Sequence, residues 1–132
     1  MSQSCRVLVI GQGGREHAIV RQLLLGRDAP EVFVWPGSDG MFEATAGLRH
    51  AAAQRLVGAS LIDAVLEQKI DLVVIGPEQP LADGIADQLR AKDVLVFGPS
   101  KDGARLESSK IYAKEIMQAA GVLTARSFVV DS

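Results

Sequence analysis

The sequence predicts an α/β protein built on a Rossmann-like, doubly wound parallel sheet. Three short runs, at residues 7–10, 72–75 and 94–97, are apolar on every position and rich in β-branched types. Such runs are typical of strands buried on both faces, as in a parallel sheet. Helical patterns lie between them, and strands that alternate with helices form right-handed βαβ units.

The remaining elements follow in chain order. Residues 32–35 predict a fourth strand and residues 48–52 a weaker fifth. Apolar residues recur at i,i+4 spacing over residues 16–25, 60–68 and 81–92, which predicts three helices. Ser60 is suited to cap the second of them.

A change of composition at residues 98–103 reads as the exit loop of the domain. A further helix is predicted over residues 108–120, with Gly121 as its stop, and residues 127–130 are suited to begin another strand. A chain of 132 residues therefore holds one domain and the edge of another region.

Bulk properties exclude several classes of function. The net charge is −2 without a dense basic cluster, so a nucleic-acid partner is not expected. No apolar run is long enough to span a membrane, and no secretory signal is visible, so we expect a cytoplasmic protein. The single cysteine, Cys5, fits a reducing compartment, and we expect it to be packed and unreactive.

The first strand leads into the glycine-rich run Gly-Gln-Gly-Gly-Arg-Glu-His at residues 11–17, followed by a helix. Backbone amides at a helix amino-terminus favour an anion. A dinucleotide fingerprint would need a third small residue where Glu16 stands, and a carboxylate after the second strand, which ends in Trp35-Pro36-Gly37. Both are missing, and the glycines could also serve only a tight turn.

A second loop, Gly-Pro-Glu-Gln-Pro-Leu at residues 76–81, follows the strand at 72–75. Open α/β sheets bind ligands at the carboxyl ends of their strands, where the winding reverses. With a strand order of 3-2-1-4-5 the two loops face each other. Glu78 then projects into the cleft, although a solvated loop carboxylate is an alternative interpretation.

Three motifs resemble glycinamide ribonucleotide synthetase (phosphoribosylamine–glycine ligase) in order and spacing. They are Val-Ile-Gly-x-Gly-Gly-Arg-Glu-His at 9–17, Ile-Asp-Leu-Val-Val-Ile-Gly-Pro-Glu-x-Pro-Leu at 70–81, and Phe-Gly-Pro-Ser-Lys-x-x-Ala-x-Leu-Glu-x-Ser-Lys at 97–110. The resemblance implies that residues 1–100 form an amino-terminal substrate-binding, pre-ATP-grasp domain. It also implies that residues 101–132 form a linker helix and the start of an ATP-grasp region.

The resemblance implies an ATP-dependent ligase of purine biosynthesis that joins glycine to 5-phosphoribosylamine. ATP phosphorylates the glycine carboxylate, and the amine attacks the acyl phosphate. ATP and Mg²⁺ (or Mn²⁺) are expected in the full-length enzyme and none bound to this chain, since the metal ligands and most of the nucleotide clamp are expected beyond residue 132. The polypeptide alone, without ATP-grasp and carboxyl-terminal domains, is therefore not expected to ligate.

The resemblance also implies roles for the residues that match the family's motifs. Gly13, Gly14, Arg15 and Glu16 are expected to line the phosphoribosylamine pocket, and Glu78 to meet ribose hydroxyls or the amine. Pro36 and Gly37 belong to a loop that usually reads Pro-Gly-Asn-x-Gly, but Ser38 replaces the asparagine.

The resemblance places Lys110 where the family has its first lysine for binding nucleotide phosphates. An alternative interpretation is that Lys110 and Lys114 only form a solvated face of a helix. His17 and His50 are interpreted as capping or packing residues. No catalytic residue and no metal ligand is predicted within the chain.

Two other classes of function stay open from the residues alone. One is a non-catalytic Rossmann-type module that binds a phosphorylated metabolite or a partner domain. The other is a fragment of a nucleotide-cofactor oxidoreductase, against which the missing carboxylate after the second strand argues.

Overall fold

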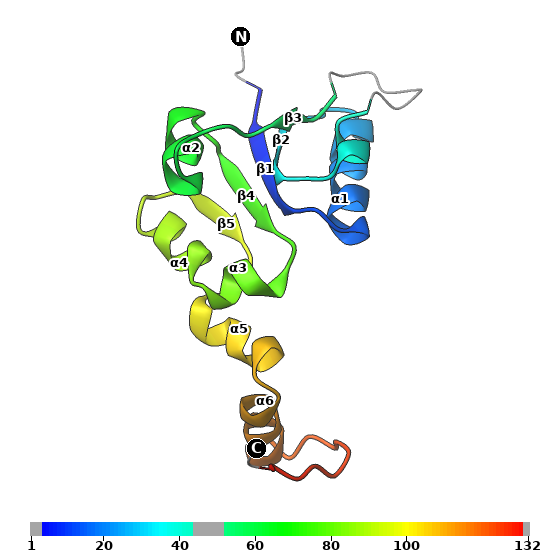
Figure 1. The fold of residues 1–132 in the computed structure, drawn as a ribbon, viewed down its shortest axis with the longest axis vertical. Helices are drawn as coiled ribbons and strands as arrows, with labels where there is room; N and C mark the ends of the chain where they lie inside the picture. The colour runs from blue at the N-terminus through cyan, green and yellow to red at the C-terminus, as the bar shows by residue number, and fades with distance from the viewer. Residues whose placement is uncertain (1–3, 44–51, 131–132) are drawn as a thin grey trace.

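The computed structural model describes residues 4–43 and 52–130, and its centre is a five-stranded parallel sheet (Figure 1). The order is β3-β2-β1-β4-β5, so the first strand in the chain is the middle strand of the sheet. The strands are β1 (Arg6–Gly11), β2 (Glu31–Pro36), β3 (Gln54–Arg55), β4 (Leu72–Ile75) and β5 (Leu95–Phe97). The predicted fold class and strand order are both confirmed.

Helices cover both faces of the sheet. α1 (Gly14–Leu25) buries Val20 and Leu24 against Val9 and Val34 on one face. On the other face, α2 (Leu61–Glu67) and α4 (Ile85–Arg90) pack on residues of β1 and β4. Figure 1 shows α1 on one side of the sheet and α2 and α4 on the other. Successive strand residues point to opposite faces, so β1, covered on both, must be apolar throughout.

The single helix predicted over residues 81–92 is wrong. The structure has α3 (Glu78–Ala82) and α4, which are separated at Gly84. Gly84 has a φ of +86°, in the left-handed region where a helix cannot continue. The apolar stripe at residues 81, 85 and 89 crosses this break, so periodicity alone could not reveal it.

The carboxyl-terminal part also differs from its prediction. Where a loop was expected at 98–103 and one helix at 108–120, the structure has α5 (Lys101–Ser108) and α6 (Lys110–Ala119). Ser100 and Ser109 each accept a backbone hydrogen bond as amino-terminal caps of these two helices. Residues 127–130 form no strand. The strand predicted at 48–52 lies mostly outside the described residues, and β3 comes later in the chain.

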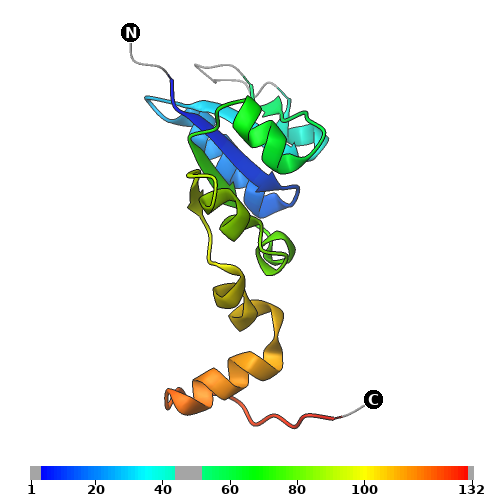
Figure 2. The ribbon, with the colours of Figure 1, turned by 90° about the vertical axis from the view of Figure 1, so that its left-hand side faces the viewer.

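α5 packs against α3 and α4, whereas α6 lies beyond α5, away from the sheet (Figures 1 and 2). The Arg105 guanidinium of α5 stacks 3.8 Å from the ring centroid of Tyr112 in α6. A domain boundary at residue 100 stays a prediction. Cys5 is exposed, contrary to the expectation of packing, and it lies just before the first residue of β1.

None of the helices within residues 4–43 and 52–130 combines the length and the apolar content needed to cross a membrane.

Candidate functional site

Three loops meet at the carboxyl edge of the sheet. They follow β1, β2 and β4, and two backbone hydrogen bonds join them across the strands. The Gly37 amide donates to the Gly11 carbonyl at 3.2 Å, and the Gly76 amide donates to the Ile10 carbonyl at 3.0 Å. The predicted meeting of the 11–17 and 76–81 loops is therefore confirmed, at the position where α/β sheets bind ligands.

The carboxylate of Glu16 fills the space between the first and third of these loops. Glu16 is only 4% exposed and is the one buried charged residue in the described part of the chain. A Cβ on Gly76 would lie 2.2 Å from Glu16 Oε1, and one on Gly11 would lie 2.3 Å from Glu16 Cγ. A Cβ on Gly13 would lie 2.9 Å from Oε2. The glycines at 11, 13 and 76 thus leave room for a side chain of the protein itself.

Both oxygens of this carboxylate are hydrogen-bonded. Oε2 accepts from the Gly13 amide at 2.9 Å, and Oε1 accepts from Arg15 Nε at 2.8 Å. Burial raises the pKa of Glu16, but the hydrogen bonds from Arg15 and Gly13 outweigh it and hold the pKa below its ordinary value. Glu16 is therefore a charged group inside the loop, and its bond to the Gly13 amide is the one that the third residue of a helix makes in a capping box.

Arg15 and Gly14 present the open side of the loop. A Cβ added to Gly14 would meet nothing within 4 Å, and the Arg15 side chain is 58% exposed. The amides of Gly14 and Arg15 belong to the first turn of α1, where no helical acceptor exists. An anion could bind at these amides beside the Arg15 guanidinium.

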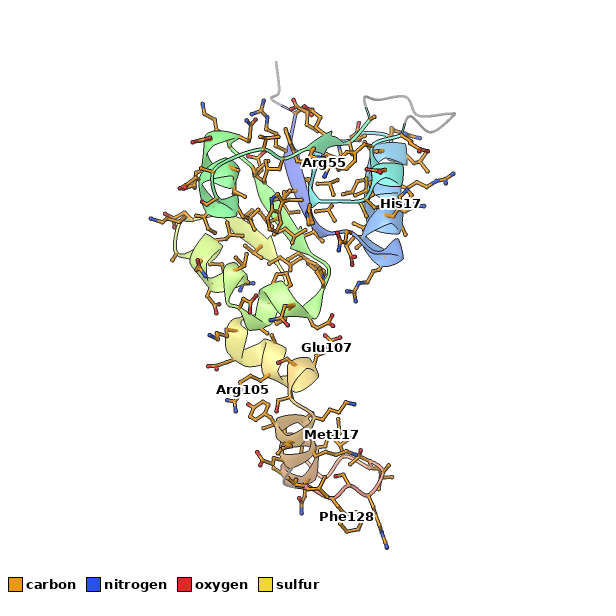
Figure 3. The ribbon with its side chains drawn as sticks, in the orientation of Figure 1. His17, Arg55, Arg105, Glu107, Met117 and Phe128 are labelled. Carbon is orange, nitrogen blue, oxygen red and sulfur yellow. The ribbon has the colours of Figure 1, made fainter. Side chains whose placement is uncertain are left out.

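Two more carboxylates border this space. Glu78 is the first residue of α3, and Glu107 lies in α5, which packs against α3. Figure 3 shows the Glu107 side chain pointing from α5 toward the α3 end of the sheet. The bond and charge of Glu16 contribute most to raising the pKa of Arg15, and the charges of Glu107 and Glu78 add to it.

Sequence reasoning did not assign Glu107 to the site, although it belongs to the third motif. Its approach to Arg15 depends on α5, which the sequence did not predict.

The loop after β2 is held by a residue that sequence reasoning missed. The Arg55 guanidinium donates to the Pro36 carbonyl and lies 4.2 Å from the centroid of the Phe42 ring. Gly37 has a φ of +70°, and a Cβ there would approach Phe42 to 2.7 Å. Arg55 lies in β3, a strand expected elsewhere, so no sequence signal marked it. His17 packs beside Gly40, as a Cβ there would lie 3.3 Å from its ring (Figure 3). His50 lies outside the described residues.

Lys110 lies on α6, apart from the three loops. It lines a groove of about 500 Å³ between α6 and residues 127–130, together with Lys114 and Phe128 (Figure 3). Lys114 Nζ donates to Thr124 Oγ1 at 2.6 Å and to the Ala125 carbonyl at 2.7 Å. The two lysines are thus different: Lys114 holds the following segment, and Lys110 is exposed. In the described ranges, no cluster of three or more His, Cys, Asp or Glu residues could hold a metal ion.

The chain matches one family of known proteins over most of its length. Residues 5–107 match the family model of the phosphoribosylglycinamide synthetase N domain. Among similar proteins, the phosphoribosylamine–glycine ligase of Corynebacterium ammoniagenes is 46% identical over 92% of this chain and 28% of its own length. That of Streptomyces coelicolor is 47% identical over 94% of this chain and 29% of its own length. The chain thus spans less than a third of these relatives.

A solved structure with a similar fold is the urea carboxylase of Kluyveromyces lactis. It matches 94% of this chain and 12% of its own, with a TM-score of 0.58 and 14% sequence identity. At such identity the likeness concerns the fold alone. The family match instead covers most of the chain, including the three loops and all but the last residue of α5. The chain therefore belongs to the phosphoribosylglycinamide synthetase N-domain family.

Proposed function

We propose that this chain acts as the amino-terminal, substrate-binding part of an ATP-dependent ligase that joins glycine to 5-phosphoribosylamine in purine biosynthesis. Family membership supports the activity, and the observation that carries the site is the meeting of three loops at one edge of the sheet. The ligated product would form when the amine attacks a glycyl phosphate and expels phosphate. In this proposal the chain holds the amine-bearing substrate.

The phosphate of 5-phosphoribosylamine would bind at the amides of Gly14 and Arg15 and at the Arg15 guanidinium. Charge-assisted hydrogen bonds to such an anion are about twice as strong as neutral ones. Gly13 shapes this loop, and Pro36 and Gly37 border it through the hydrogen bond to Gly11. Glu78 would accept hydrogen bonds from ribose hydroxyls or from the amine.

Lys110 is proposed to meet the phosphates of ATP. Its ammonium group is exposed on the first turn of α6, next to an open groove. The metal ion of the reaction would need ligands other than those of residues 4–43 and 52–130, where no suitable cluster exists. Cytoplasmic localisation is part of the same proposal, since the proposed substrates are soluble metabolites.

The substrate site can be tested in a full-length ligase that contains this domain. Glu78→Ala should raise the KM for 5-phosphoribosylamine, because it removes a charge-assisted hydrogen bond worth about 1–3 kcal/mol when buried. The KM for ATP should stay within about twofold, because α5 separates α3, which begins at Glu78, from α6, which begins at Lys110 (Figure 1). Steady-state kinetics with each substrate varied in turn provide the measurement.

Glu67→Ala is the matched control. Glu67 is also an exposed glutamate, but it lies at the end of α2, just before β4 begins, and therefore at the opposite edge of the sheet. It should leave both KM values unchanged. Equal kinetics for the Glu78 and Glu67 variants would refute the proposed site.

The activity itself is tested with two polypeptides. The 132-residue chain, mixed with ATP, glycine and 5-phosphoribosylamine, should release no ADP above background, whereas a chain of the relatives' full length should. Turnover by the short chain would contradict the proposed division of labour. Micromolar binding of NAD or NADP in calorimetry would instead favour an oxidoreductase.

A further inference from the structure

The glycine-rich loop already holds an anion of its own. The Glu16 carboxylate accepts from the Gly13 amide at 2.9 Å, the kind of bond that a bound phosphate makes at a helix amino-terminus. It also occupies the space that the missing Cβ atoms of Gly11, Gly13 and Gly76 leave open. A ligand phosphate therefore cannot enter this part of the loop without displacing a buried, hydrogen-bonded side chain.

The second oxygen of the same carboxylate directs Arg15. It accepts from Arg15 Nε at 2.8 Å, which fixes one edge of the planar guanidinium. The terminal nitrogens of the guanidinium are further hydrogen-bond donors, and the side chain is 58% exposed. A guanidinium held by one carboxylate keeps donors for a second anion. Glu16 is buried, whereas the Arg15 side chain is exposed, so the bond between them anchors an exposed group to a buried one.

The neighbours of Arg15 make its direction important. Glu78 and Glu107 lie close enough for their charges to act on it. An unrestrained arginine would be drawn to either of them, because an exposed long side chain can pair with any nearby carboxylate. The bond to Glu16 competes with these pairings and holds the guanidinium at the loop from which α1 begins.

We propose that Glu16 is a positioning residue that acts on the substrate phosphate through Arg15 and does not touch the substrate itself. This proposal rests on the proposed function, in which Arg15 binds the phosphate of 5-phosphoribosylamine. It gives Glu16 a different role from the pocket contact that the family resemblance implies. Removing the carboxylate should leave the charge of Arg15 in place and lose its direction.

The test is a double-mutant cycle in the full-length ligase. Glu16→Gln should raise the KM for 5-phosphoribosylamine roughly tenfold, within the range found for directly coupled residues, with kcat and the KM for ATP nearly unchanged. Arg15→Ala should raise it at least as much. The double variant should be no worse than Arg15→Ala alone, because Glu16 then has nothing to position. A further increase in the double variant would overturn the proposal.

Two additional measurements separate positioning from folding. Arg15→Lys keeps the charge but lacks the planar guanidinium with its Nε donor, so it should raise the KM for 5-phosphoribosylamine as Glu16→Gln does. It leaves the buried Glu16 in place, so this test holds even if Glu16→Gln folds poorly. In the isolated chain, the NMR signal of the Arg15 Nε–H should shift and exchange faster with water in Glu16→Gln. An unchanged signal would overturn the proposal whatever the kinetics.

The outcomes also distinguish this proposal from the proposed function. If Glu78→Ala raises the KM for 5-phosphoribosylamine but Arg15→Ala does not, the site stands and the role of Glu16 is refuted. If neither variant affects that KM, the proposed function fails and the role of Glu16 fails with it.

Discussion

Glu16 combines burial with a full charge, and this makes its contribution to stability depend on pH. Its pKa is lowered in the folded state relative to the ordinary 4.5. A group with a depressed folded pKa stabilises the fold fully above its unfolded value, and the stabilisation is lost as pH falls through the folded value. The decrease in folding stability at acidic pH therefore depends in part on Glu16.

We expect wild type to be more stable than Glu16→Gln by roughly 1 kcal/mol at pH 7, since hydrogen bonds to a charged group are stronger than neutral ones. The difference should shrink as pH falls from 4.5 through the lower pKa of Glu16. Urea unfolding of both chains at several pH values from about 3 to about 7, a range that includes the ordinary carboxyl pKa, measures this difference. A difference independent of pH would contradict the charged state of Glu16.

Gly76 and Gly14 form a matched pair for testing the packing around Glu16. Gly76→Ala should cost about 1–3 kcal/mol of folding free energy, the usual cost of overpacking, because its Cβ would lie 2.2 Å from Glu16 Oε1. Gly14→Ala should be neutral or stabilising by up to about 1 kcal/mol, as its Cβ meets nothing and alanine favours helices. Combining Gly76→Ala with Glu16→Ala should recover part of the loss in urea unfolding.

At the residue scale, the sequence predicted where the glycine-rich loop lies but not that the Glu16 side chain fills it. Gly11 to His17 predicted an anion site and excluded a dinucleotide fingerprint because Glu16 stands where a small residue is required. That Glu16 itself occupies the cradle depends on Gly76, which is brought beside it only by the pairing of β1 with β4. Arg55 and Glu107 likewise reach the site from elements whose bounds the sequence did not predict.

At the scale of elements, the break between α3 and α4 depends on one backbone conformation. Gly84→Ala should cost about 1–2 kcal/mol, because an L-residue is disfavoured in the left-handed region. Gly84→Asn should cost less, since asparagine tolerates that region. Chemical denaturation of the three chains tests the order. The added Cβ would only touch Lys101 at 3.4 Å, so crowding contributes little. If alanine and asparagine cost the same, backbone strain is not the cause.

Elements were predicted best where burial is two-sided. The continuous apolar runs of β1 and β4 left no alternative to interior strands, and α1 and α2 were recovered with their bounds nearly as observed. Helices at the carboxyl-terminal end were divided wrongly because Gly84 and Ser109 interrupt the backbone without interrupting the apolar pattern. A conformational break of one residue has no hydrophobic signal.

For the whole molecule, two large apolar side chains should respond very differently to truncation. Leu89→Ala should cost about 2–5 kcal/mol, because Leu89 is fully buried between α4 and the sheet. Phe97→Ala should change stability by only about 0.5 kcal/mol, because Phe97 is 72% exposed on the edge strand β5. Thermal or urea unfolding of the isolated chain compares them. A large loss for Phe97→Ala would mean that another surface covers it in solution.

The central position of β1 also sets the order in which the molecule can fold. Each residue of β4 that pairs with β1 lies 65 positions later in the chain than its partner. The hydrogen bond from the Arg6 amide to the Asp71 side chain spans the same separation. Loop closure over such a distance must precede any gain from the contact, so folding of the sheet is governed by non-local pairing. During synthesis, a nascent chain that has not yet extended past Gly76 has β1 and β2 but no closed loop around Glu16. The proposed ligand site therefore cannot form until β4 has left the ribosome.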